Sequence, residues 1–155
     1  MQYILMLLAV AGITAADQIT KYLTVANIAL GQRVEWMPGF LGLTYVQNTG
    51  AAFSSLEGQL WLFILIFVAF TLALVWEHRH NSMNFTTFDW WCIAAVYGGG
   101  LGNMIDRLRL GYVVDMIRTE FMVFPVFNVA DCFITCGCIA LMASQIIGMA
   151  KARKK

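Results

Sequence analysis

The residues best suited to chemistry are acidic and amide side chains between Gly98 and Asp131. This stretch, GGGLGNMIDRLRLGYVVDMIRTEFMVFPVFNVAD, separates two apolar runs that are long enough to be membrane helices. Its polar residues are Asn103, Asp106, Arg107, Arg109, Asp115, Arg118, Glu120, Asn128 and Asp131. Charged groups are costly at membrane depth, so several of them at the edges of apolar runs predict a working site.

Two carboxylates in this stretch stand out. Asp115 lies in YVVDMI, a strand-like run whose burial should raise the pKa of the carboxyl group. The loop up to Phe127 contains Pro125 and is long enough to fold back, so Asp115 can meet Asp131 at the membrane surface. Two such carboxylates share a proton: one accepts a proton from water while the other donates to a carbonyl oxygen. The pair therefore predicts general acid–base hydrolysis of an amide.

Each acidic residue also has a structural interpretation. Asn128 and Asp131 have the spacing of a capping box, which satisfies the first N–H groups of a helix. Asp106 is adjacent to Arg107 and one turn after Asn103, which favours an ion-paired helix end. Asp115 lacks such an explanation.

Other hydrolytic sites fit less well. A serine nucleophile would require Ser54 or Ser55 against Lys21, and neither serine lies in a nucleophile elbow. A zinc peptidase would require a motif such as HExxH, which the chain lacks. The four cysteines, Cys92, Cys132, Cys136 and Cys138, form no CxxC pair and are expected to be small buried apolar residues. We expect no metal and no other cofactor.

The composition is typical of a membrane protein. Of the 155 residues, 60% are hydrophobic and 12% are charged, far from globular averages. The net charge of +1 gives no field that would recruit nucleic acid. Because no Lys or Arg precedes the apolar segment at Leu5, this segment is expected to remain as a membrane helix. The pattern predicts one integral membrane domain, 1–155, with four spans at about 3–23, 60–76, 88–105 and 130–149.

The segments between these spans carry their own patterns. Arg33–Met37 and Leu41–Val46 predict two short strands at the membrane surface, and 51–56 predicts a short surface helix. Residues 77–88, with both histidines, predict a solvated loop. The small residues from Gly98 to Gly102 predict close packing against a neighbouring helix.

Asp17 and Lys21 lie four residues apart near the end of the first span. This spacing favours an ion pair with Lys21 reaching up to the lipid headgroups, and a second hypothesis makes the pair a brace for the site. Four spans place both termini on one side of the membrane. Five Lys or Arg residues then fall on each side, so their number does not predict the orientation. The basic tail KARKK next to the last span favours cytoplasmic termini.

Four motifs in this order resemble the lipoprotein signal peptidases, the bacterial signal peptidase II family of aspartyl peptidases. They are DQITK at 17–21, QNTGAAFS at 47–54, GNMIDRLRLGYVVDMI at 102–117 and FNVAD at 127–131. The resemblance covers nearly the whole chain. Its departures are Met116 after the first aspartate, where Phe is usual, and Cys132 after the second, where Ser or Ala is common.

The resemblance implies a function and a set of roles. The enzyme would remove the signal peptide from diacylglyceryl-modified prolipoproteins, cutting just before the lipidated cysteine. Asp115 and Asp131 would be the catalytic dyad. Support or substrate contact would come from Asp17, Lys21, Asn48, Gly50, Asn103, Asp106, Arg107 and Asn128. The implied partners are the prolipoprotein, membrane lipid and cyclic peptide inhibitors such as globomycin, with the enzyme acting as a monomer.

The implied fold is an all-α membrane protein. Four transmembrane helices would carry a small extracytoplasmic β-sheet, the cradle, and a short surface helix. The location implied is the bacterial inner membrane, with the site at its outer face.

Two other classes remain open from the residues alone. Asp17, Lys21, Asp106 and Arg107 would also suit a relay in a small ion-coupled transporter, which flux into proteoliposomes would reveal. The glycine face would suit a purely structural partner of other membrane proteins, whose role would not depend on Asp115.

Overall fold

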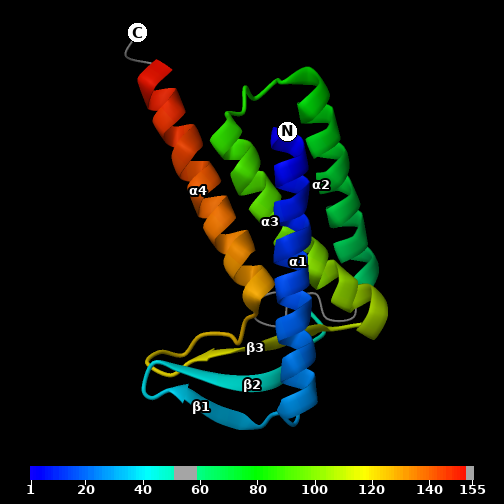
Figure 1. Cartoon of the computed structure of the whole chain (residues 1–155), viewed down its shortest axis with the longest axis vertical. Coiled ribbons are helices and arrows are strands. Elements are labelled where there is room, and N and C mark those ends of the chain that lie inside the picture. Colours follow the sequence, from blue (N-terminus) through cyan, green and yellow to red (C-terminus); the bar gives the residue numbers. More distant parts are fainter. Residues whose placement is uncertain (51–58, 153–155) are drawn as a thin grey trace.

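The described part of the chain forms four long helices and three short strands. The computed structural model describes residues 1–50 and 59–152. The helices are α1 (Gln2–Asn27), α2 (Leu60–His80), α3 (Thr87–Leu110) and α4 (Val129–Ala152), and the strands are β1 (Arg33–Met37), β2 (Leu41–Asn48) and β3 (Val113–Thr119). Both termini lie at one end of the helices, and the sheet lies at the other (Figure 1). The surface helix expected at 51–56 falls outside the described residues.

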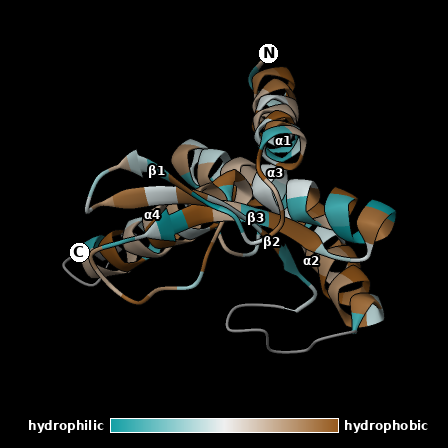
Figure 2. Cartoon of the chain, turned by 90° about the horizontal axis from the view of Figure 1, so that it is seen from below, coloured by the Kyte–Doolittle hydropathy of each residue, from teal (hydrophilic) through white to brown (hydrophobic). Residues whose placement is uncertain are grey.

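Within the described residues, three helices, α1, α2 and α4, are long and apolar enough to cross a membrane. Most of their residues are hydrophobic, and the brown segments along α2 and α4 in Figure 2 mark such residues. Large side chains such as Leu7, Leu72 and Ile146 are more than half exposed on these helices. Exposed apolar side chains along long helices are what lipid contact requires, so the chain is a multi-pass membrane protein.

The predicted loop at 77–88 begins later than expected. α2 continues through the two histidines to His80, so these residues form the last helical turn rather than a loop. The turn is held by aromatic contacts: the His78 ring packs edge-on against Tyr3 and Trp90, and the His80 ring stacks on Trp76. The apolar run ends at Trp76, whereas the helix continues for one more turn, in which aromatic contacts hold His78 and His80.

The glycines of α3 allow close helix packing, as their spacing predicts. A Cβ atom built on Gly99 would lie 2.5 Å from the carbonyl oxygen of Ala130 in α4. A Cβ atom on Gly98 would lie 3.2 Å from the carbonyl oxygen of Val10 in α1. α3 therefore lies between α1 and α4 at distances that only a glycine surface permits.

Gly102→Ala is expected to destabilise the protein by about 1–3 kcal/mol, since its methyl group would overlap the buried Asp17 carboxylate. Thermal unfolding in detergent measures the change. Gly12→Ala is the matched control, because a Cβ atom there meets no other atom within 4 Å. Equal unfolding temperatures for the two variants would contradict the tight packing at Gly102.

The sheet is antiparallel in the order β1-β2-β3. β1 and the start of β2 have the predicted bounds, and β2 continues to Asn48. The register places Val46 opposite Asp115 and Asn48 opposite Val113. Tyr45, Val114 and Met116 form the small core of this region. The sheet thus fixes Asp115 beside the end of β2 and directs it toward the helices.

Candidate active site

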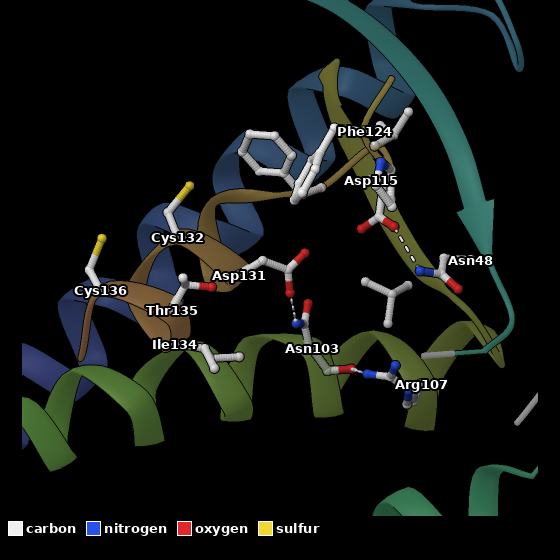
Figure 3. A pocket seen from close by; sticks show the side chains of 14 residues that line it. Asn48, Asn103, Arg107, Asp115, Phe124, Asp131, Cys132, Ile134, Thr135 and Cys136 are labelled. Atoms are coloured by element: carbon white, nitrogen blue, oxygen red, sulfur yellow. Dashed lines mark hydrogen bonds between the residues drawn. The ribbon is translucent and has the colours of Figure 1, made fainter. Parts of the chain in front are cut away.

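Two carboxylates, Asp115 of β3 and Asp131 of α4, point into one cavity of about 510 Å³ (Figure 3). The cavity is lined by Asn48, Asn103, Arg107, Val113, Asp115, Phe124, Pro125, Val126, Phe127, Asp131, Cys132, Ile134, Thr135 and Cys136. Its polar residues gather at the end near the sheet, and apolar residues make up most of the remaining wall. The cavity can therefore hold an apolar ligand with its polar part against the carboxylates.

A single residue, Asn128, connects the two carboxylates. Its side-chain amide donates to Asp115 Oδ1 at 2.6 Å, and its backbone N–H donates to Asp131 Oδ2 at 3.1 Å. In return, its side-chain oxygen accepts from the backbone N–H of Asp131 at 2.9 Å. The last two bonds form the predicted capping box at the start of α4. Capping and pairing of the carboxylates are thus properties of the same residues rather than alternatives.

Asp115 is almost completely buried. Its Oδ2 accepts a hydrogen bond from Asn48 Nδ2 at 2.9 Å. Burial, together with the nearby charge of Asp131, raises the pKa of this carboxyl to about 6, although hydrogen bonds from the amides of Asn48 and Asn128 oppose the rise. A carboxyl with a pKa near 6 can both hold and release a proton close to neutral pH.

Asp131 has N–H donors on both oxygens. Besides the bond from Asn128, its Oδ1 accepts from Asn103 Nδ2 at 2.8 Å. It lies in the first turn of α4, where the helix dipole favours negative charge. Both oxygens of Asp115 also accept from N–H groups, but Asp115 is more deeply buried and does not lie at a helix N-terminus, so it suits a group that donates a proton and Asp131 suits one that accepts.

A buried ion cluster lies behind the cavity and consists of Asp17, Lys21 and Asp106. Lys21 Nζ lies 2.9 Å from Asp17 and 3.0 Å from Asp106, and it donates to Asn103 Oδ1 at 2.8 Å. Lys21 is only 3% exposed, so the prediction that it reaches up to the headgroups is wrong. Its three partners use all three N–H donors, which holds the side chain inside the protein.

The cluster joins four elements around the site: α1, α3, α4 and β3. Asp17 accepts from the backbone N–H of Ala130 in α4 at 3.0 Å, and Asp106 accepts from that of Val114 in β3 at 3.0 Å. Asp106 is ion-paired as predicted, but its partner is Lys21 of α1 rather than the adjacent arginine. Gln18 was not predicted as a site residue, and it donates to Asp106 at 2.8 Å and to the Gly102 carbonyl at 3.1 Å.

Arg107 lies at the edge of the cavity, away from the ion cluster. Its Nη2 donates to the carbonyl oxygen of Gly50 at 2.9 Å, and its guanidinium carbon lies 4.1 Å from the centre of the Phe63 ring in α2. The Gly50 N–H donates to Asn48 Oδ1 at 3.0 Å. Arg107 and Gly50 therefore fix the position of Asn48, which contacts Asp115.

Several cavity residues were not predicted from the sequence. Phe124, Val126 and Phe127 form one wall, and Cys132 and Cys136 of α4 form part of another. All four cysteines are free. Cys92 is buried as expected, whereas Cys132 and Cys138 are partly exposed and Cys136 is exposed. The apolar run around Pro125 is visible in the sequence. Composition alone, however, does not distinguish a loop that lines a cavity from a loop that only connects two elements.

Metal-binding residues do not gather in the part of the chain that the structure describes: no group of three or more His, Cys, Asp or Glu side chains is placed to hold an ion. The arrangement that is present, two carboxylates with amide donors beside a mostly apolar cavity, is suited to acid–base chemistry on a bound amide.

Comparisons with known proteins give one consistent result. The family model described as signal peptidase (SPase) II matches residues 9–147. The lipoprotein signal peptidase of Enterococcus faecalis is 44% identical over 140 residues, which cover 89% of this chain and 85% of that protein. The lipoprotein signal peptidase of Streptococcus pyogenes serotype M2 is 42% identical over 139 residues, with 89% and 90% covered.

Two solved structures, each described as a bacterial membrane enzyme, have the same fold. One superposes with a TM-score of 0.88 at 31% sequence identity and covers 97% of this chain and 92% of its own. The other superposes with a TM-score of 0.79 at 33% identity, with 90% of both chains covered.

Proposed function

The chain belongs to the signal peptidase II family, a family of proteases, and from this premise we propose that it removes signal peptides from diacylglyceryl-modified prolipoproteins. The cut falls on the N-terminal side of the lipidated cysteine. The observation that carries the proposal is the cavity where Asp115 and Asp131 point toward the same space between amide donors. Its mostly apolar wall suits a substrate that enters with a lipid attached.

The mechanism follows from the surroundings of the two carboxylates. Asp131 accepts a proton from a water molecule, whose oxygen attacks the scissile carbonyl carbon while Asp115 donates its proton to the carbonyl oxygen. The tetrahedral intermediate then collapses: the proton on Asp131 passes to the cysteine nitrogen, the C–N bond breaks, and Asp115 recovers its proton from the hydroxyl. Asn48, Asn103 and Asn128 are positioning residues that hold the two carboxyl groups.

The ion cluster and the edge of the cavity support this geometry. Lys21, held by Asp17 and Asp106, bonds to the oxygen of the Asn103 amide, so the nitrogen of that amide faces Asp131. Arg107 and Gly50 hold Asn48. No step in this mechanism requires a metal ion.

We also propose that α3 is a fourth membrane span, within a single peptidase domain. Its polar side chains Asn103 and Asp106 are buried among the other elements, so they need not face lipid. Charged residues that belong to a site make a span less apolar without exposing charge to the bilayer.

The orientation in the bacterial inner membrane follows from which basic residues are already paired. On the site end, Lys21 and Arg118 form ion pairs with carboxylates, and Arg107 is held by a carbonyl and an aromatic ring, which leaves Arg33 and Arg109 as exposed basic residues. The basic tail has no such cluster of carboxylates in its sequence. This asymmetry supports cytoplasmic termini and an active site at the extracytoplasmic face.

The enzyme acts as a monomer, and cyclic peptides such as globomycin inhibit it by filling the cavity.

The test uses two prolipoprotein peptides that differ only in the diacylglyceryl group on cysteine. We expect the purified enzyme to cut the lipidated peptide directly before the cysteine and to leave the unmodified peptide intact, as mass spectrometry of the products would show. EDTA is expected to leave the rate unchanged. Cleavage of both peptides at similar rates, or loss of activity to EDTA with recovery on zinc addition, would contradict the proposal.

A further inference from the structure

An apolar surface at the far end of the sheet has no partner within the described residues. We name it the apolar lip, and it consists of Phe40 in the β1–β2 turn and Phe121–Phe124 in the β3–α4 loop. Phe40, Phe121, Met122 and Phe124 are about half exposed, and Val123 is fully exposed. Five large apolar side chains that are adjacent and exposed mark a surface that contacts something apolar.

The apolar lip is an ordered surface. The rings of Phe40 and Phe121 stack with their centres 5.1 Å apart and their planes 12° from parallel. The backbone N–H of Glu120 donates to the Phe40 carbonyl at 3.0 Å, and the Thr119 hydroxyl donates to the Met122 carbonyl at 3.0 Å. These contacts hold the lip in place, although its side chains stay about half exposed or more in the part of the chain that the structure describes.

The position of the apolar lip relative to the helices points to its partner. The loop that carries it leads directly into α4, one of the three apolar spans, and lies between the sheet and that helix (Figure 1). Only Pro125–Asn128 separate the lip from the first residue of α4. Ile139, Met142 and Ile146 of α4 are exposed, as the side chains of the lip are, whereas residues 125–134 between the two surfaces are partly or fully buried. The charged neighbours on the sheet side, Arg118 and Glu120, pair with each other at 2.6 Å.

We propose that the apolar lip inserts into the membrane leaflet around the site end of the helices and keeps the mouth of the cavity open to lipid. The loop itself forms one wall of the cavity through Phe124–Phe127, and α4 forms another through Cys132, Thr135 and Cys136. The opening between these walls then faces the bilayer. On the proposed function, a substrate enters sideways through this opening while its acyl chains stay in lipid.

The first experiment places a benzoylphenylalanine photo-crosslinker at position 123 in protein reconstituted into nanodiscs. We expect irradiation to add the mass of one phospholipid to the protein. Ile146, exposed on the lipid-facing side of α4, is the positive control position, and Glu35, exposed on β1, is the negative control. A dimer cross-link from position 123 would assign the lip to a second copy of the chain instead. Adducts at position 146 without any at 123 would place the lip in water. Either result overturns the proposal.

The second experiment measures what the lip does for substrate entry. Phe121→Ser combined with Val123→Ser is expected to slow cleavage of a bilayer-embedded lipopeptide about tenfold or more, because losing two buried apolar side chains costs at least the energy of a tenfold change. Neither residue lines the cavity, so cleavage of the same peptide in detergent should stay within about twofold. Equal rates in both media would overturn the role in entry. Failure of the unmodified enzyme to cut in either medium would count against the proposed function instead.

Discussion

Asp115→Asn is expected to lower kcat for cleavage of a lipidated prolipoprotein peptide by about 10²- to 10⁴-fold, the usual contribution of a general acid or base. Asparagine has the same shape as aspartate but has no exchangeable acid proton to give to the carbonyl oxygen. Folding should survive the change, because burial already disfavours the charged form of Asp115. Cleavage kinetics and thermal unfolding in detergent, measured on the same preparation, separate the two effects.

The matched control is Glu35→Gln, which removes one carboxylate from an exposed position in the same sheet. It should leave both cleavage and unfolding unchanged. If Asp115→Asn kept activity within a few-fold of the parent, the dyad would have to be abandoned.

Asp131→Asn should abolish cleavage as well, but it tests the mechanism less cleanly. The Asp131 side chain also accepts the backbone N–H of Asn128 in the capping box of α4. Loss of a helix cap costs about 1 kcal/mol, so reduced stability is expected beside reduced activity. For this reason Asp115→Asn is the more direct test of the catalytic dyad, and Asp131→Asn is a supporting test.

Local patterns made much of the fold predictable. β-branched and aromatic runs predicted β1 with its observed bounds, and apolar length predicted three helices that qualify as spans. The Asn128 and Asp131 spacing predicted the capping box that forms. Each of these features depends on residues close together in the chain, which a sequence displays directly.

Contacts between distant segments could not be read in the same way. Lys21 and Asp106 are far apart in the sequence, and only the packing of α1 on α3 brings them together. The i,i+4 spacing revealed Asp17 as a partner but not that the ammonium group lies inside the protein. The small residues from Gly98 to Gly102 predicted close packing, but not that the side chain next to Gly102 is Asp17 of the ion cluster.

Lys21→Met is expected to destabilise the protein by about 3–5 kcal/mol, the usual cost of removing one partner from a buried ion pair. Asp17 and Asp106 would be left facing each other with no cation, and both are buried. The Asn103 amide would lose its bond from Nζ at the same time, so any protein that still folds should cleave more slowly. Thermal unfolding and the yield of membrane-inserted protein measure the first effect.

Lys151→Met provides the matched control, since Lys151 is exposed in the last turn of α4 and its replacement should cost little. A second variant tests the cause: adding Asp106→Asn to Lys21→Met removes one of the two stranded carboxylates and should recover part of the lost stability, because the penalty comes from uncompensated charge rather than from lost packing. Recovery of stability without recovery of activity would show that Lys21 also positions Asn103 for catalysis. An unchanged unfolding temperature for Lys21→Met alone would mean that the ion cluster does not stabilise the helices that hold the two aspartates.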